Sequence, residues 1–309
     1  MRRLNLITGA VLLAVASNLY ADNSAKAVQN GNDNDATIEQ TGWLNEALVR
    51  QNGSTNTASI YQGLIAEGNQ ASIVQIGSDN DVTVSQGDES HFSVASIYQE
   101  GTGNLAEVQQ SWRTNDLQAS SIGDDNRISA TQTGIATAEA RQIGNGNSLT
   151  LAQDGVYHYA NAAVYQVGDE NSATIDQGDG GAIQLAQNGN SNTADIEQFT
   201  LFGEVVFNQV GDNNLLAVEQ SGRDNSFRGS STGNDNSVEV EQGFDGNRAS
   251  VVQVGDGNMA DISQLASYNE ARISQIGASN QASITQSAEM LNAVIVQNGT
   301  GNLATITQQ

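Results

Sequence analysis

Amide side chains recur along this sequence at a spacing that could join one chain segment to the next. The motif is N-x-A-x-I-x-Q-x-G, and clear copies run from Asn69 to Gly77 and from Asn269 to Gly277. An amide group both donates and accepts hydrogen bonds, so identical Asn or Gln side chains stacked one above another can form continuous ladders. The spacing therefore predicts that equivalent segments of the chain bind each other through their Asn and Gln side chains.

The repeat covers almost the whole sequence. It begins with the unit Asn23–Gln29 and ends with the unit Asn302–Gln308, which gives 26 units. Gln fills its position in 24 of them, and serine replaces it at Ser121 and Ser231. Units follow each other every 11 residues from Gln187 onward and every 10 to 13 residues before it, which places the small insertions in turns.

Other chemically capable side chains form no recognisable site. Acidic turns at residues 123–126 and 168–171 could attract calcium, but they lack the G-G-x-G-x-D pattern of calcium-binding β-rolls, and we favour solvated turn carboxylates. The two histidines, His91 and His158, are expected at the surface. We therefore expect no catalytic residues, no metal site and no cofactor, and we do not expect an enzyme.

The spacing within a unit predicts a β-strand. Side chains at i, i+2, i+4 and i+6 lie on one face of a strand, and here they are Asn, Ala, Ile or Val, and Gln. A helix is disfavoured because the period of two persists and Gly recurs about every 11 residues. The apolar residues predicted to face inward are Ile38, Ile60, Ile73, Ile97, Ile175, Ile196, Ile262, Ile273, Ile284, Ile295 and Ile306.

Charged residues are excluded from one face of the predicted strands. None of the four inward positions of any unit holds Asp, Glu, Lys or Arg, whereas the intervening positions include Glu39 and Arg50. Burial of that face explains the exclusion, because an unpaired charge is costly to bury. The alternative is that individual Gln side chains lie exposed at strand ends. We assign to an inward self-assembly ladder Asn23, Gln29, Asn34, Gln40, Asn45, Gln51, Asn280, Gln286, Gln297, Asn302 and Gln308.

One strand and one turn make up each unit, so two units make one coil of about 22 residues. The predicted fold is therefore all-β: a parallel β-solenoid with two strands per coil and about 13 coils. Equivalent residues of successive coils would lie one above another. Such coils are expected to stack head-to-tail into cross-β fibres.

Composition narrows the class of protein. The chain has 309 residues and a formal net charge of −24, which argues against a nucleic-acid partner. It contains no Cys, so neither a disulfide framework nor a thiolate metal site is expected. Aromatic residues are only 5%, which fits a thin core.

The N-terminal segment is typical of a secretory signal peptide. Arg2 and Arg3 precede a short apolar stretch that ends near small residues. The expected organisation is a signal peptide over residues 1–21 and one repeat domain over residues 22–309, and we expect a secreted protein.

Repeat units reach both ends of the expected mature chain. An end coil of a solenoid exposes unpaired backbone groups, and capping elements normally cover them. Repeated head-to-tail stacking that does not close gives a filament. We therefore expect a fibre-forming subunit whose main partner is a further copy of itself.

The repeat A-x-I-x-Q-x-G-x-x-N-x-A strongly resembles the curlin repeat of bacterial curli. Instances begin at Ala36, Ala71 and Ala173, and the resemblance covers essentially residues 23–308. It implies a functional amyloid that forms extracellular cell-surface fibres for biofilm matrix, adhesion and cell aggregation. It also implies export through the periplasm of a Gram-negative envelope, with an outer-membrane secretion pore, accessory proteins and a nucleator subunit as partners.

Two alternatives stay open. The terminal unit Asn302–Gln308 is regular and uncharged, which favours the major fibre subunit over a minor nucleator curlin, whose last repeat is degenerate and basic. The second alternative is a monomeric β-solenoid adhesin.

Overall fold

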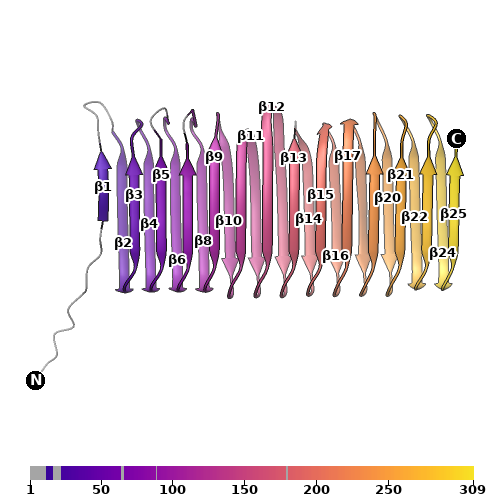
Figure 1. The fold of residues 1–309 in the computed structure, drawn as a ribbon, viewed down its shortest axis with the longest axis horizontal. Coiled ribbons are helices and arrows are strands. Elements are labelled where there is room, and N and C mark those ends of the chain that lie inside the picture. Colours follow the sequence, from indigo (N-terminus) through magenta and orange to yellow (C-terminus); the bar gives the residue numbers. More distant parts are fainter. Residues whose placement is uncertain (1–11, 17–21, 64–65, 88, 179) are drawn as a thin grey trace, which may run out of the picture. The chain divides into compact units, whose positions relative to one another are not determined.

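The computed structural model describes residues 12–16, 22–63, 66–87, 89–178 and 180–309, the first of these segments as backbone alone. All regular elements in this part of the chain are β-strands (Figure 1). Within it, no helix is long and apolar enough to cross a membrane.

The chain divides into two compact units, Met1–Gly146 and Asn147–Gln309, called unit 1 and unit 2. Unit 1 contains β1 (Leu12–Ala16), β2 (Ser24–Asn32), β3 (Asp35–Gln40), β4 (Glu46–Ser54), β5 (Thr57–Gln62), β6 (Gln70–Ser78), β7 (Asp81–Gln86), β8 (Val94–Thr102), β9 (Leu105–Ser111), β10 (Asn115–Ile122) and β11 (Arg127–Ile143). Unit 2 contains β12 (Ser148–Val167), β13 (Ser172–Gly178), β14 (Gly181–Asn188), β15 (Thr193–Leu201), β16 (Glu204–Val210), β17 (Leu215–Arg223), β18 (Ser226–Thr232), β19 (Ser237–Gln242), β20 (Arg248–Val254), β21 (Met259–Gln264), β22 (Glu270–Ala278), β23 (Gln281–Gln286), β24 (Asn292–Thr300) and β25 (Leu303–Gln308).

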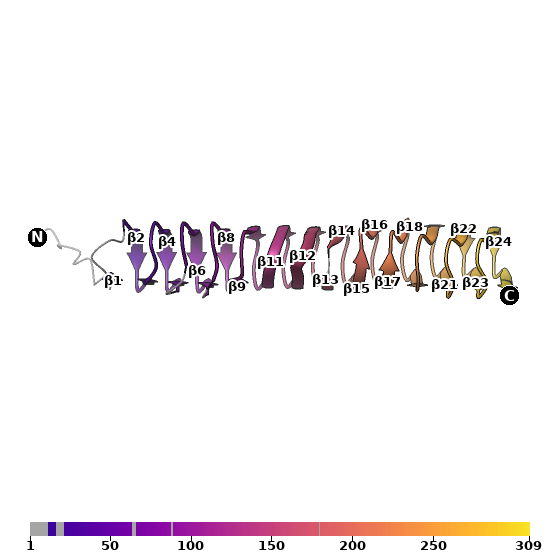
Figure 2. The same ribbon diagram turned by 90° about the horizontal axis from the view of Figure 1, so that it is seen from above.

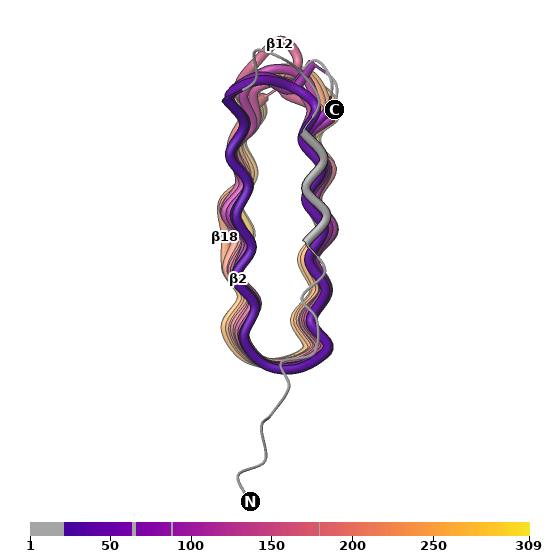
Figure 3. Tube along the Cα trace, turned by 90° about the vertical axis from the view of Figure 1, so that its left-hand side faces the viewer, coloured from indigo at the N-terminus to yellow at the C-terminus, as the bar shows by residue number. Residues whose placement is uncertain are grey.

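Within each unit the strands form two parallel sheets. A strand pairs with the strand two places along the chain, as β3 does with β5 and β4 with β6, so odd-numbered and even-numbered strands form an odd sheet and an even sheet (Figure 2). β11 and β12 are long strands that bend and contribute one arm to each sheet. Seen end-on, a coil of either unit is a narrow loop of two facing strands (Figure 3).

The strand register places equivalent residues above one another. Ile38 pairs with Ile60 and Gln40 with Gln62 in unit 1. Successive pairing partners are therefore one coil apart, as the sequence spacing predicted. The all-β, parallel two-strand β-solenoid is confirmed, with about 13 turns over the two units.

The segment expected to be a signal peptide contains β1. β1 pairs in parallel with β3 and so extends the odd sheet of unit 1 by one strand. The remaining residues of the expected signal peptide, 1–11 and 17–21, lie outside the described part of the chain.

The core is a thin double layer of small and branched side chains, mostly Ala, Ile, Val and Leu. An irregular unit in unit 2 shows how the layer keeps its volume. Phe207 and Phe227 are buried and stacked, with ring centroids 5.5 Å apart. Gly229 lies in register with Phe207, and a Cβ atom there would come within 2.9 Å of the Phe207 ring. The missing side chain at Gly229 therefore makes room for the large one beside it.

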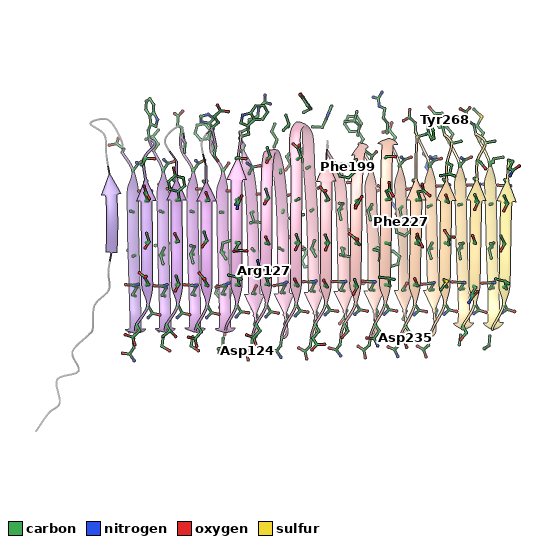
Figure 4. The ribbon with its side chains drawn as sticks, viewed as in Figure 1. Asp124, Arg127, Phe199, Phe227, Asp235 and Tyr268 are labelled. Atoms are coloured by element: carbon green, nitrogen blue, oxygen red, sulfur yellow. The ribbon has the colours of Figure 1, made fainter. Side chains whose placement is uncertain are left out.

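Two kinds of turn connect the strands. A turn from the even sheet to the odd sheet always has the sequence Gly-x-x-Asn, and we call these turns the GxxN edge; a turn from the odd sheet to the even sheet varies in length and sequence, and we call these the variable edge. Asp124 in unit 1 and Asp235 in unit 2 lie on the GxxN edge, and Phe199 and Tyr268 in unit 2 lie on the variable edge (Figure 4). The GxxN turns span residues 31–34, 53–56, 77–80, 101–104, 123–126, 144–147, 168–171, 189–192, 211–214, 233–236, 255–258, 277–280 and 299–302.

Candidate self-assembly surface

The inward Gln side chains of unit 1 are hydrogen-bonded into ladders. Nε2 of Gln40 donates to Oε1 of Gln62 at 2.8 Å, and Nε2 of Gln62 donates to Oε1 of Gln86 at 2.8 Å. Nε2 of Gln62 also donates to the backbone carbonyls of Glu46 and Asn69, both at 3.1 Å. The buried amide therefore has partners above and below, as burial of a polar group requires.

The ladder in the odd sheet of unit 2 has a direction. It runs from Gln198 through Gln220, Gln242 and Gln264 to Gln286, with Nε2 to Oε1 distances between 2.7 and 3.0 Å. In each bond the donor is the residue nearer the N-terminus. The even sheet follows the same rule. Donor N–H groups of the Gln ladders therefore point toward the C-terminal coils.

The two serines in the Gln series continue the ladder on one side only. Ser231 Oγ donates to Oε1 of Gln253 at 2.7 Å, and Ser121 makes the same bond to Gln142 at 3.2 Å. Gln209, the residue in register before Ser231, donates instead to the backbone carbonyl of Thr193 at 3.1 Å. A serine side chain is too short to meet the amide of the preceding coil, so these positions are gaps.

Asn side chains on the GxxN edge form a second ladder. Nδ2 of Asn236 donates to Oδ1 of Asn214 at 3.1 Å and to the backbone carbonyl of Gly255 at 2.7 Å. Oδ1 of Asn236 accepts from the backbone N–H of Asn258 at 3.0 Å and from its Nδ2 at 3.1 Å. Here the donor is the residue nearer the C-terminus, so the Asn ladder runs opposite to the Gln ladders.

The Asn residues of the variable edge are joined differently. Oδ1 of Asn247 accepts the backbone N–H of Asn269 at 2.9 Å, while its Nδ2 donates to the carbonyl of Gly243 in its own turn. The same backbone bond joins Asn45 to Asn23 at 3.0 Å. The expected Asn-over-Asn amide bond is thus present on the GxxN edge and is replaced by a backbone bond on the variable edge.

The Gly of a GxxN turn packs against the Gly of the next coil of the same unit. A Cβ atom on Gly53 would lie 1.8 Å from the carbonyl oxygen of Gly77, and one on Gly77 would lie 2.0 Å from that of Gly101. These residues also have φ values of 135°, 121° and 124°, which L side chains rarely adopt. Only glycine therefore permits the close stacking that aligns the two amide ladders.

Sequence reasoning missed a third ladder in the exposed GxxN turns. Oδ1 of Asp212 accepts the backbone N–H of Asn190 at 2.8 Å, and Oδ1 of Asn234 accepts that of Asp212 at 2.9 Å. In unit 1, Oδ1 of Asp124 accepts the backbone N–H of Thr102 at 2.8 Å. The sequence does show an Asp or Asn directly after the Gly of these turns. It does not show the hydrogen-bond partner of that side chain, which lies one coil away. These carboxylate and amide oxygens join the turns of successive coils.

The structure places the predicted ladder residues at two levels of exposure. Seven of them are buried: Asn34, Gln40, Asn45, Gln51, Asn280, Gln286 and Gln297, the last of which lies in the C-terminal coil. Four are half-buried: Asn23, Gln29, Asn302 and Gln308. The inward Ile residues named from the sequence are buried, except Ile306 in β25, which is half-buried. In the described chain β2 and β25 each pair with a strand on one side only, which leaves the inward side chains of these two units partly open.

Titratable groups with shifted pKa values lie outside the ladders. Partial burial, with a smaller contribution from Glu107, raises the pKa of Asp81 on the outward face of β7. A hydrogen bond from the Tyr98 hydroxyl to Glu100 at 2.6 Å raises the pKa of Tyr98. Among the described residues, no group of three His, Asp or Glu side chains could hold a metal ion. Among the described residues, the ladders are the arrangement that can bind an equivalent coil.

A family model named the curlin associated repeat matches residues 31–63, 144–178, 233–265 and 260–287. These four matches support a curlin-family protein with multiple repeats. Each matched segment contains one or two GxxN turns and the strand that follows, which are the parts that carry the Gly stack and the amide ladders. The comparison with curated protein sequences found no match. The repeats and the β-solenoid fold together support a curli-type structural subunit.

Proposed function

We propose that this curlin-family protein is a secreted subunit that assembles head-to-tail into extracellular amyloid fibres of a biofilm matrix. The observation that carries the proposal is the opposite direction of the Gln and Asn ladders. Gln donors point toward the C-terminal coils, and Asn donors on the GxxN edge point toward the N-terminal coils. The two ends of the solenoid therefore offer different hydrogen-bonding groups.

At the C-terminal coil, β24 and β25 present Gln donors. Nε2 of Gln297 donates to the carbonyl of Gln281 at 2.8 Å, and Nε2 of Gln308 donates to that of Asn292 at 3.1 Å, which leaves each amide a second N–H. In interior coils the equivalent N–H reaches the Gln of the next coil. An incoming copy would place Gln29 over Gln297 in the even sheet and supply that acceptor.

The Asn ladder completes the joint from the other side. Oδ1 of Asn34 accepts the backbone N–H of Asn56 at 3.2 Å and its Nδ2 at 2.9 Å. In an assembled fibre, Nδ2 of Asn34 in the incoming copy would donate to Oδ1 of Asn302. A head-to-head contact would instead oppose acceptor to acceptor in the Gln ladders, and unmatched buried amides are costly. Ladder polarity therefore favours one orientation of growth.

Residues at the joint also gain apolar burial. Ala304 and Ile306 are half-buried in β25, whereas their counterparts Ala282 and Ile284 in β23 are 4% and 0% exposed. Covering β25 with β3 of another copy would bury them as β25 buries β23. Each added chain then creates a new end identical to the one it covered, which is how a fibre end templates growth.

The regular terminal unit favours the major subunit. The proposed partners are further copies of this chain, a nucleator subunit, and an outer-membrane secretion pore with accessory proteins. A minor nucleator would seed fibres of another chain when present in small amounts. A monomeric β-solenoid adhesin would remain unassembled.

Seeded growth of the expected mature chain, residues 22–309, tests the proposal. Gln297→Ala removes a donor at the joint and leaves Gln29 of the next copy unpaired, so we expect elongation about tenfold slower, from a hydrogen bond worth about 1.4 kcal/mol. Gln281→Ala is the matched control, because the exposed Gln281 side chain points outward on β23.

Fibre growth would be followed by a cross-β dye and checked by electron microscopy. Wild-type and Gln281→Ala chains should elongate at the same rate. Equal rates for Gln297→Ala and wild type would contradict the role of the ladder. A wild-type chain that stays monomeric in the presence of seeds would contradict fibre assembly and favour the adhesin.

A further inference from the structure

The two strands of the first coil, β2 and β3, differ in burial although both carry the repeat motif. The inward Ala25 of β2 is exposed, and Ala27 is half-buried. The inward Ala36 and Ile38 of β3 are 0% and 1% exposed, like the equivalent residues of interior coils. A further strand therefore has to lie over β3 but not over β2.

β1 is the strand that covers β3, and it belongs to the leader, by which we mean residues 1–21, the predicted signal peptide. β1 pairs with β3 in parallel, with Leu12 in register with Ala36 and Ala16 in register with Gln40. It lies at the N-terminal end of the stacked strands, and its arrow points in the same direction as that of β3 (Figure 1). β1 therefore occupies the place of an odd strand in a coil before the first.

The proposed head-to-tail joint uses the same edge of β3. Equivalent residues pair inside the solenoid, as Ile306 of β25 does with Ile284 of β23. In the joint, the same register would set Ile306 of one copy beside Ile38 of the next. β1 already holds that position, with Ala14 paired to Ile38. Because one edge of a strand can pair with only one other strand, β1 and the β25 of another copy exclude each other.

β1 leaves the Gln ladder at this edge incomplete. Nε2 of Gln40 donates to Gln62, but no described residue donates to Oε1 of Gln40. The residue of β1 in register with Gln40 is Ala16, which has no amide group. The corresponding residue of β25 is Gln308, which has a second N–H available beyond its bond to the carbonyl of Asn292. Another copy can therefore complete the ladder, and β1 cannot.

β1 competes well with another copy in spite of this defect, because it is tethered to β3 by the chain itself. A tethered segment acts at an effective concentration of about 1 mM, roughly a thousandfold above a free copy at about 1 μM. Once the leader is cut from the chain, this advantage is lost. The partner that completes the ladder then takes the edge.

We propose that β1 is a removable cap, which occupies the β3 edge while the leader is attached and leaves it to the β25 of another copy once the leader is removed. This role rests on the proposed head-to-tail assembly. A chain with its leader still has an open C-terminal coil, because β24 and β25 each pair with one described strand only. It can therefore join the N-terminal end of a fibre, where its own β1 blocks the next addition, but it cannot extend the C-terminal end.

Seeded elongation of two purified chains tests the cap. Residues 1–309 carry β1 and residues 22–309 do not, and each chain is added as monomer to the same fragments of fibres of 22–309. We expect 1–309 to elongate the fragments at least about tenfold more slowly than 22–309, because its tethered cap exceeds the free copies in effective concentration. Elongation of 1–309 at the rate of 22–309 would overturn the proposal.

Two proline variants of 1–309 separate the cap from a general effect of the leader. A14P/V15P removes the N–H groups of two adjacent β1 residues, one of which faces β3 because neighbouring N–H groups of a strand point to opposite sides. This variant should elongate at the rate of 22–309. The matched control I7P/T8P makes the same change outside β1 and should stay as slow as 1–309. Equal rates for the two proline variants would contradict the cap.

Hydrogen exchange separates this inference from fibre assembly. In unassembled chains, the backbone amides of residues 35–40 should exchange about tenfold more slowly in 1–309 than in 22–309 or in A14P/V15P, because β1 protects them. If 22–309 forms no fibres, the proposed function fails, and the exchange rates still test the β1 contact. Slower exchange in 1–309 supports it, and equal exchange in the three chains contradicts it.

Discussion

The GxxN edge and the variable edge join the same two sheets in opposite ways. On the GxxN edge the Asn always lies five positions after the Gln, or the serine that replaces it, of the even strand, as from Gln51 to Asn56. On the variable edge the corresponding offset is four positions from Gln177 to Gly181 and seven from Gln62 to Asn69. All variation in coil length therefore falls on one edge. The edge with constant length also carries the Gly stack and the amide ladder, which shows that these contacts fix coil register.

The variable edge carries side chains that the GxxN edge excludes. Phe244 and Tyr268 are 62% and 60% exposed and have φ values of 64° and 61°, a conformation that is costly for a bulky residue. The corresponding positions of the GxxN edge hold Asp, Asn, Ser, Thr, Glu or Gly. Unpartnered polar atoms are also found on the variable edge or in the strands beside it, such as Oδ1 of Asn115 and Nδ1 of His158. This edge tolerates change because the register is already determined elsewhere.

The largest expected difference in stability is between two Gly→Ala variants, one on each edge. Gly77→Ala puts Cβ 2.0 Å from the carbonyl of Gly101 at a φ of 121°, and we expect a loss of about 3 kcal/mol or more in the free energy of unfolding. The Cβ atom that Gly87→Ala adds on the variable edge meets no atom within 4 Å. This variant should change the free energy of unfolding by less than about 0.5 kcal/mol. Denaturant unfolding of the two freshly purified variants measures both free energies. Equal losses for Gly77→Ala and Gly87→Ala would contradict the difference between the two edges.

A smaller difference is expected between the two kinds of Asn. Asn236→Ala breaks four side-chain hydrogen bonds in a buried ladder and should cost about 3 kcal/mol. Asn247→Ala breaks two and should cost about 1 to 2 kcal/mol. Thermal unfolding of the two variants gives the comparison. An equal or larger loss for Asn247→Ala would show that the variable edge contributes at least as much to register as the GxxN edge.

Much of the fold could be predicted because one pattern repeats along the chain. The alternation that places Ile38 and Gln40 on one face is local, and charge exclusion marks that face as inward. The bent strands β11 and β12 could not be predicted, because residues near Gly134 continue the strand where turns were expected.

Other features depend on residues one coil apart. The unit with Phe227 and Gly229 looks irregular in the sequence, and its packing becomes clear only when Phe207 lies over Gly229. The turn carboxylate of Asp212 likewise has its partner, the N–H of Asn190, in the previous coil. The Asn ladder of the GxxN edge and the backbone hydrogen bonds of the variable edge are made by Asn residues of the same motif. The two kinds of bond differ because the turns have different geometry, which the motif does not show.

Cysteine cross-linking tests head-to-tail stacking most directly, because the chain has no Cys of its own. Val28 on β2 and Val296 on β24 are exposed, and they would lie side by side on neighbouring strands if β2 of one copy stacks on β24 of another. Fibres of the double variant Val28→Cys and Val296→Cys should form covalent multimers on mild oxidation, and each single variant should form none. Dimers from either single variant, or intact fibres of the double variant without cross-links, would contradict directional head-to-tail assembly.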